Sequence, residues 1–512
     1  MKEKSAGKKM LLTAVFMAGA TLAAKVLALV RDALIASSFG TGMEADAFMA
    51  ASKLPTTLFD MVIGGVISAT FIPVFSQVMQ KKNKDEAMKF ANKFVTMIFL
   101  ITVIISVLGI ALASPLTDFI APGYTAEKHA LTVQLMSIMF PMIIFTGFAF
   151  SFVGILQSFG EYNIPSIISV VYNIAIILYC AVFSNRFGIQ GLAVTMLVAW
   201  SLQVAVQIPS LVKFKYKFRL DFRLKDENIK KALLLAGPML ISTWVQPLYT
   251  IINSRLASSI DGAYSSLEYA NRLYLIATGV VSFVVTNLIF PKMSQANAKD
   301  DHAEAIKLVN ISLKSMMIVI FPLMAGIIVL STPITTVIYM RGEFTPDKVP
   351  VVASALSCYA VGMFGLSINE VLSKTFFSMQ NSKTPMINSI ISMLFNIAAA
   401  YILFNTVGVS GLALAAALGS IVNALLNGIC LKRKVPDAFS ISDLDTFWKT
   451  FVSAAVMGIA VWLLHRGISG YFSGFTGNVI ICVICAAAGV LIYAAMVYVL
   501  KVKEIRALLK RG

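Results

Sequence analysis

The chain is poor in charged residues, which make up 13% of its 512 residues, while 58% are hydrophobic. A soluble protein of this length exposes far more charge, so a soluble globular class is excluded. The mean hydropathy of +0.83 and apolar runs of about twenty residues indicate a polytopic helical membrane protein. A membrane β-barrel is excluded because its strands would be alternating segments of about ten residues.

Histidine and cysteine are also scarce, and neither residue type forms a site pattern. His129, His302 and His465 lie far apart without metal-ligand spacing. Cys482 and Cys485 have metal or redox spacing, but no histidine or second cysteine pair accompanies them. The chain contains no glycine-rich phosphate loop, nucleophile elbow or carboxylate-rich metal motif. We therefore expect neither covalent chemistry nor ATP hydrolysis, and no required cofactor.

Fourteen apolar segments are long enough to cross a membrane as helices. They lie near residues 10–36, 47–76, 94–114, 131–158, 164–184, 188–212, 232–257, 264–289, 309–330, 351–379, 384–405, 408–431, 447–466 and 476–500. The first one continues past Lys25 and predicts an uncleaved helix, not a signal peptide.

The charge of the connecting loops orients these spans. Alternate loops, beginning with the N-terminal segment, hold 30 of the 42 Lys and Arg, whereas the opposite loops hold five. Basic loops lie on the cytoplasmic side of a membrane. Fourteen spans therefore place both termini in the cytoplasm. The formal charge of +17 is explained by these loops, so we expect no nucleic-acid partner.

The sequence repeats itself at an offset of about 220 residues. Phe71–Gln77 resembles Ile289–Gln295, and Phe187–Ala193 resembles Val407–Ala413. We predict two pseudo-symmetric six-helix lobes, residues 1–220 and 221–440, followed by two additional helices in residues 441–512. Each repeat holds an even number of spans, so both insert in the same direction, with a central cavity between them.

Seven basic side chains lie inside the expected spans, although an ionised group near the bilayer centre costs roughly 2.5–3.5 kcal/mol. They are Lys25, Arg31, Lys53, Arg255, Arg272, Lys314 and Lys374. The first five accompany four acids, Asp32, Asp46, Asp60 and Glu268. Residues of this kind normally face a watery cavity or a partner. A surplus of cations in such a cavity favours the binding of phosphate.

A second interpretation is that these charges are interior salt bridges that lock helices together. It stays open for two pairs with the spacing of one helical turn, Glu268–Arg272 and Glu370–Lys374. These pairs are candidates for gating or for ion pairing. In the first span, Lys25 and Asp32 share a helix face, whereas Arg31 leaves the helix about 100° away. Lys314 is interpreted as a residue that extends its charge to the membrane surface.

At these residues the chain resembles the MurJ/MviN family of lipid II flippases, within the multidrug/oligosaccharidyl-lipid/polysaccharide exporter superfamily. The resemblance covers all fourteen spans. It is densest at Lys25–Leu34, Ala45–Phe48, Lys53–Pro55, Ala270–Leu273 and Arg341–Thr345. The resemblance implies a V-shaped pair of lobes around a cationic cavity, with the last two helices forming a groove for a lipid tail.

The resemblance also assigns site residues. The expected substrate-binding residues are Lys25, Arg31, Asp32, Asp46, Lys53 and Arg272, with Arg255 as a substitute for a missing cation. Two departures bear on the substrate contacts. Phe59 and Asp60 stand where many members of the family have an arginine, and Asn271 replaces the usual acid before Arg272.

The implied function is translocation of lipid II, an undecaprenyl-diphosphate-linked disaccharide-pentapeptide, between the leaflets of the bacterial plasma membrane by alternating access. The membrane potential or a coupled monovalent cation would supply the energy, and the expected partners are membrane lipids and cell-wall synthesis proteins. Three alternatives stay open. They are a flippase for another polyprenyl-linked glycan, a cation-coupled multidrug exporter of the same superfamily, and a non-transporting scaffold for cell-wall assembly.

Overall fold

The computed structural model describes residues 2–59, 61, 70–223, 225–234, 245–284, 289–298, 301–438, 441–472 and 474–502. Throughout these residues the secondary structure is helical, with no strand. For these residues the expectation of an all-α fold is thereby confirmed. Contacts between Cα atoms divide the chain into two units, Met1–Ser265 and Ser266–Gly512.

The first unit contains the helices up to the beginning of α12. They are α1 (Lys2–Phe39), α2 (Met43–Phe59), α3 (Ile72–Lys81), α4 (Lys84–Ala111), α5 (Ala113–Ile120), α6 (Ala126–Met139), α7 (Met142–Ser158), α8 (Asn163–Val182), α9 (Ser184–Lys213) and α11 (Val245–Ala257). Within this unit α1 packs on α8, α8 on α9, α9 on α7, and α7 on α4. In addition, α2 packs on α6 and α11 on α5.

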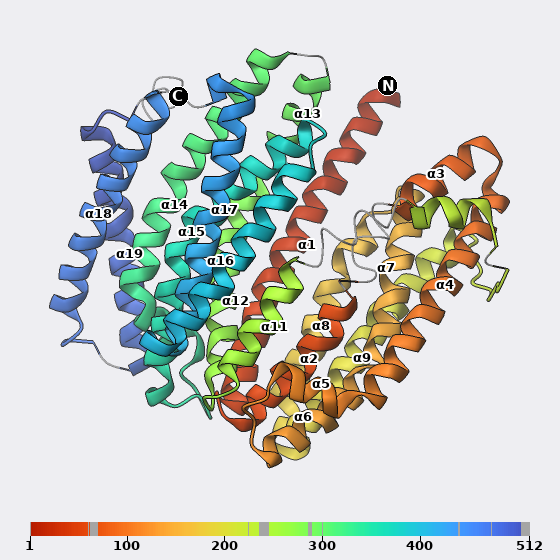
Figure 1. Ribbon diagram of the computed structural model, residues 1–512, viewed down its shortest axis with the longest axis horizontal. Coiled ribbons are helices and arrows are strands. Elements are labelled where there is room, and N and C mark those ends of the chain that lie inside the picture. Colours follow the sequence, from red (N-terminus) through yellow and green to blue (C-terminus); the bar gives the residue numbers. More distant parts are fainter. Residues whose placement is uncertain are drawn as a thin grey trace. The chain divides into compact units, whose positions relative to one another are not determined.

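The second unit begins in the first turn of α12 (Ala263–Val284). It continues with α13 (Phe290–Ala298), α14 (His302–Tyr339), the 3-10 turn η4 (Pro346–Lys348), α15 (Val349–Ser378), α16 (Lys383–Val407), α17 (Val409–Lys434), η5 (Pro436–Ala438), α18 (Ile441–Ile468) and α19 (Gly474–Val499). In it α15 packs on α17 and α14, and α16 on α17 (Figure 1).

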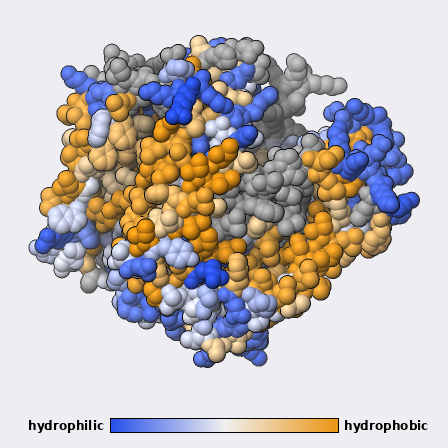
Figure 2. All heavy atoms as spheres, viewed as in Figure 1, coloured by the Kyte–Doolittle hydropathy of each residue, from blue (hydrophilic) through white to orange (hydrophobic). Residues whose placement is uncertain are grey.

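Ten helical segments among the described residues are long and apolar enough to cross a membrane. Each coincides with one of the expected spans, so the chain is a multi-pass membrane protein. The other four expected spans, near 10–36, 47–76, 232–257 and 264–289, include positions whose backbone or side chains lie outside the described set. Figure 2 shows hydrophobic side chains covering the middle of the helices, with hydrophilic side chains gathered toward their ends.

Backbone geometry repeats along the chain at the interval seen in the sequence. Positive φ angles occur at Gly188 (56°) and Gly408 (72°), which are 220 residues apart. The same spacing separates Gly160 (78°) from Gln380 (57°). Glycine is favoured in this left-handed region because it lacks a Cβ atom. Equivalent turns therefore follow equivalent helices in the two sequence repeats.

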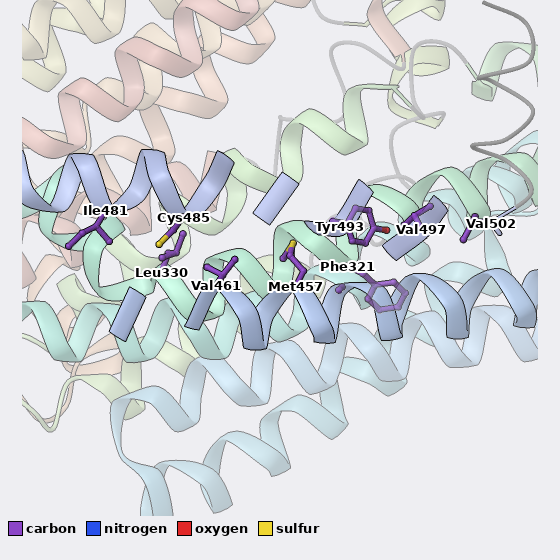
Figure 3. Close-up of a cluster of buried hydrophobic side chains, with 10 residues drawn as sticks. Phe321, Leu330, Met457, Val461, Ile481, Cys485, Tyr493, Val497 and Val502 are labelled. Atoms are coloured by element: carbon purple, nitrogen blue, oxygen red, sulfur yellow. The ribbon is translucent and has the colours of Figure 1, made fainter. Parts of the chain in front are cut away.

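The last two helices pack on α14 through an apolar cluster. Phe321 and Leu330 of α14 meet Met457 and Val461 of α18 and side chains of α19 such as Cys485 (Figure 3). The hydroxyl of Tyr493, in α19, donates to the backbone carbonyl of Ile318 at 2.8 Å. The burial of the phenol is thus compensated by a hydrogen bond.

Candidate functional site

Arg31 is the centre of a buried polar cluster between α1 and α8. Its Nε and Nη2 atoms donate to Asp32 Oδ1 at 2.9 and 2.7 Å, and its Nη1 atom donates to Asn173 Oδ1 at 2.9 Å. Arg31 is 8% exposed and Asp32 5%. Although the two side chains leave the helix in different directions, the long arginine side chain turns back to its neighbour. These contacts use three of the five N–H donors of the guanidinium.

Asn173 holds this cluster in place from α8. Its Nδ2 atom donates to the backbone carbonyls of Ala24, at 3.1 Å, and Ser169, at 2.9 Å. The ring of the adjacent Tyr172 lies 5.6 Å from Arg31 Cζ, within the range of a cation–π interaction. Lys25 follows Ala24 on α1 and is half-buried. Only the fold places Tyr172 and Asn173 against Arg31.

A second cluster surrounds Asp46, at the beginning of α2. Its Oδ2 atom accepts from Lys128 Nζ at 2.5 Å and from the backbone N–H of Gly262 at 2.9 Å. Its Oδ1 atom accepts from the backbone N–H of Ser265 at 2.7 Å. Asp46 is fully buried. One carboxylate therefore joins α2, the beginning of α6 and the turn between α11 and α12.

Lys128 is shared between two carboxylates. Besides Asp46, its Nζ atom donates to Asp261 Oδ1 at 2.8 Å, and it lies 4.4 Å from the centre of the Tyr124 ring. The Tyr124 hydroxyl donates to the backbone carbonyl of Asp46 at 3.3 Å. Burial, together with the carboxylates of Asp46 and Asp261, raises the pKa of Tyr124, so the phenol stays protonated and remains a donor.

The backbone at this cluster is closely packed. Gly262 has a φ of +72°, and a Cβ atom built there would lie 2.2 Å from the backbone oxygen of Thr41. Gly123, in the loop before α6, is packed against the residues that precede this turn. A Cβ atom on it would lie 2.7 Å from Ser259 Cα. Only glycine fits at either position without a shift of the backbone.

Lys53 and Arg255 lie near this cluster within the first unit, in different surroundings. Half-buried Lys53 lines a small pocket, with room for about one water molecule, together with Thr57, Ser254 and Tyr264. Arg255 donates from Nη1 to the backbone carbonyl of Phe119, at the end of α5, and its Cζ atom lies 5.3 Å from the ring of Phe119. In this arrangement Arg255 joins α11 to α5.

The other expected site residues belong to the second unit. Arg272 on α12 is exposed, and Glu268 one turn earlier is half-buried. On α15, Lys374 Nζ lies 4.0 Å from Glu370 Oε1 and 5.4 Å from the centre of the Phe290 ring. Both residues of this pair are half-buried. Asp60, whose identity differs from the family pattern, lies outside the described residues.

Sequence reasoning missed Lys128, Asp261 and Asn173 as members of these clusters. Lys128 is one of the five basic residues in the loops expected on the outer side. This scarcity is informative, because outer loops of membrane proteins contain few basic residues. A lysine in such a loop therefore indicates a specific structural role. Asp261 and Asn173 carried no signal of this kind.

The model of the family described as "Lipid II flippase MurJ" matches residues 35–482, which is most of the chain. The chain belongs to the lipid II flippase MurJ family. A probable lipid II flippase MurJ of Rickettsia prowazekii is 30% identical over 412 residues, covering 80% of this chain and 81% of that protein. The lipid II flippase MurJ of Burkholderia cenocepacia is 28% identical over 428 residues, covering 82% and 83%.

Solved structures agree with this membership. A lipid II flippase MurJ in an inward closed conformation matches with a TM-score of 0.82 and 25% identity, covering 95% of this chain and 98% of that one. An inward-facing multidrug resistance MATE family transporter of the MOP superfamily matches with a TM-score of 0.69 and 15% identity, covering 83% and 98%. The second similarity concerns the fold alone. As a member of the MurJ family, the chain is a transporter.

Proposed function

We propose that this chain is the flippase that carries lipid II from the cytoplasmic to the outer leaflet of the plasma membrane. The observation that carries this function is the match of the MurJ family model to residues 35–482. Basic side chains within otherwise apolar helices support it, because lipid II brings a diphosphate into the membrane. No step of the transport breaks or forms a covalent bond, and no cofactor is required.

Two guanidinium groups are candidates for binding the diphosphate, Arg31 in the first unit and Arg272 in the second. Arg272, on α12, is exposed. Arg31 is buried, but two of its N–H donors remain beyond its contacts with Asp32 and Asn173. A guanidinium fixed in this way is already oriented for a phosphate, so little side-chain entropy is lost on binding. Lys25 supplies a further positive charge on the same helix.

The Asp46 cluster closes the outer end of the transport path. It joins helices of the first sequence repeat to the turn between α11 and α12, which belongs to the second repeat. Release of the head group on the outer side requires these contacts to separate. Lys53 and Arg255 adjoin this closure, and the Glu370–Lys374 pair acts as an ion pair that fixes α15 against α13.

The chain crosses the membrane fourteen times, with both termini in the cytoplasm. Residues 1–220 and 221–440 form the two lobes, and residues 441–512 guide the undecaprenyl tail. An apolar cavity of about 340 Å³ between α14 and α18, lined by Met324, Ile328, Phe451, Gly458 and Trp462, supports this role. A polyprenyl chain can lie in such a cavity without loss of hydrogen bonds.

The membrane potential is sufficient to drive the transport. Outward movement of one negative charge through an inside-negative potential gains about 2.3 kcal/mol per 100 mV. A monovalent cation that moves with the substrate would add to this gain. Synthesis proteins of the cell wall, which consume lipid II on the outer surface, are the expected protein partners.

Complementation of a bacterium depleted of its own lipid II flippase tests this function, with outer-leaflet lipid II measured by surface accessibility. The wild-type chain should restore growth and surface lipid II, whereas the double variant Arg31→Gln/Arg272→Gln should restore neither. Undiminished surface lipid II in the double variant would contradict the mechanism. Transport of a different polyprenyl-linked glycan in reconstituted vesicles, without transport of lipid II, would favour the glycan alternative.

A further inference from the structure

From the last residue of α9 onward, the chain alternates between basic and hydrophobic side chains. We call residues 213–225 the strap. Its even positions hold Phe214, Tyr216, Phe218, Leu220 and Phe222, and its odd positions hold Lys213, Lys215, Lys217, Arg219, Asp221, Arg223 and Lys225. Alternation of this kind separates the two kinds of side chain onto opposite faces of an extended chain.

Lys213 ends α9, and Phe214 and Lys215 form a turn. From Lys217 to Arg223 the backbone of the strap is extended and is attached to α4. The side-chain amide of Asn92 donates to the carbonyl of Lys217 and accepts from the N–H of Arg219, both at 3.3 Å. A carbonyl and an N–H two residues apart point to the same side only in an extended chain. One turn further along α4, the hydroxyl of Thr96 accepts from the N–H of Asp221 at 3.0 Å.

The hydrophobic side chains in the first half of the strap pack on α7, whereas those in its second half are exposed. The Phe214 ring stacks on Phe159 with 5.1 Å between centroids, and Phe218 meets Phe148 edge to face at 5.4 Å. Tyr216 is 4% exposed. In contrast, Leu220 is 50% exposed and Phe222 is 62% exposed.

The strap lies at the level where α4 enters the membrane. The first turns of α4 carry charged residues as far as Lys93, and the helix is apolar from Phe94 to its end. Asn92 and Thr96, which hold the strap, flank this transition. Lys93 itself pairs with Asp226, just after the strap, at 2.7 Å. The exposed hydrophobic side chains of the strap therefore lie at the height of the boundary between lipid headgroups and acyl chains.

The basic face of the strap has a large excess of positive charge. Its six Lys and Arg face one carboxylate, Asp221, which already accepts from Arg223 Nε at 3.0 Å. Lys213, Lys215, Lys217, Arg219, Arg223 and Lys225 are all exposed. The complementary partner is therefore a dense array of anions.

We propose that the strap is a binding site for anionic phospholipid headgroups, with Leu220 and Phe222 inserted among the acyl chains beneath them. Cations and hydrophobic side chains that alternate at the membrane boundary match a phospholipid, which presents a phosphate directly above an apolar chain. A nucleic acid or an acidic protein would satisfy the charges but would leave Leu220 and Phe222 in water. This inference does not depend on lipid II as the transported substrate.

The full-length protein, reconstituted in phosphatidylcholine bilayers, allows a direct test with spin-labelled lipids. The relative association constant of spin-labelled phosphatidylglycerol against spin-labelled phosphatidylcholine is measured for wild type and for Lys217→Gln/Arg219→Gln. Wild type should prefer the anionic lipid. The variant should lose about fivefold of this preference for each charge removed, and added salt should weaken the wild-type preference.

Lys81→Gln/Lys82→Gln is the matched control, because it removes two exposed charges from the end of α3, before the charged first turns of α4. It should keep the wild-type preference. The charge-conserving variant Lys217→Arg/Arg219→Lys should also keep it, which shows that the strap tolerates substitution. The proposal is wrong if wild type shows no preference, or if the control pair reduces the preference as much as the strap pair does.

Discussion

Lys128 Nζ lies 2.5 Å from Asp46 Oδ2, and both side chains are closed off from solvent, with 5% and 0% of their surface exposed. Two charges in such a place are stable only while each has its partner, because a single buried charge is strongly disfavoured. The pair is also attached to two backbone N–H groups of the turn before and at the beginning of α12. Separation of this turn from α2 must therefore break several bonds together.

Replacement of Asp46 by Asn should destabilise the protein. The substitution leaves the Lys128 charge buried with only the exposed Asp261 as partner, and the loss of one member of a buried pair typically costs about 3–5 kcal/mol. Thermal unfolding in detergent measures the effect. Asp261→Asn is the control, since the Asp261 side chain is 72% exposed and an exposed ion pair contributes less than about 1 kcal/mol. Equal effects of the two substitutions would show that burial does not govern this cluster.

Gly262→Ala should disturb the same closure through the backbone alone. Alanine in the left-handed region costs roughly 1–2 kcal/mol, and its Cβ atom would lie 2.2 Å from the Thr41 oxygen. We expect a lower unfolding temperature. Gly42→Ala is the matched control, because a Cβ atom there has nothing within 4 Å. An unchanged unfolding temperature in Gly262→Ala would contradict the close packing of this turn.

Arg31→Lys should impair transport although it keeps the charge. A lysine ammonium lacks the planar fork with which Arg31 binds Asp32 and Asn173 at the same time. Loss of one or two charge-assisted hydrogen bonds, at about 1.5–3 kcal/mol each, corresponds to a decrease of about tenfold or more in surface lipid II at limiting expression. Lys25→Arg serves as the comparison, since a point charge there should tolerate the exchange. Full activity of Arg31→Lys would show that charge alone is needed.

Gly458→Leu should slow transport without a loss of stability. Gly458 lines the apolar cavity between α14 and α18, and a Cβ atom there approaches only Ala325, at 3.5 Å. A leucine side chain would fill space that the proposed function gives to the undecaprenyl tail. Gly467→Leu, on the same helix where nothing lies within 4 Å, should leave transport unchanged. Normal rates of lipid II transport in vesicles with Gly458→Leu would argue against a tail in this cavity.

The attachment of the strap should weaken in acid. Burial opposes ionisation of Asp226, but hydrogen bonds from Lys93 and Asn228 outweigh it and lower the pKa of the carboxyl. A carboxyl group whose pKa is lowered by folding stabilises the folded state at every pH above its ordinary pKa, which is near 4. This stabilisation is lost as the pH falls through the pKa of the group in the folded protein. Hydrogen exchange of residues 213–225, corrected for its intrinsic pH dependence, should therefore increase below about pH 4. Asp226→Asn should show the increase already at pH 7, and its absence there would contradict the role of this pair.

Much of the architecture could be predicted because hydrophobic periodicity and length are local properties. Ten of the expected spans coincide with helices of sufficient length and hydropathy, and the repeat reappears in the φ angles of Gly188 and Gly408. The candidate site was predicted less completely. Arg31 and Asp46 were identified as charges in apolar surroundings, but Asn173 is an ordinary polar residue in the sequence. Its contact with Arg31 joins residues 142 positions apart, which no local pattern can reveal.

By itself, the sequence determined that this chain is a helical membrane protein, because the cost of burying charge in a bilayer marks both the spans and the charged positions within them. Its motifs added the resemblance to the MurJ family. Only the tertiary structure decided which charged residues form pairs with one another. It turned Arg31 back onto Asp32 and placed Lys128 against Asp46. The physical reason is that the energy of a charge depends on its distance from other charges and from water. Distances between helices are set by packing, which the order of residues along the chain does not display.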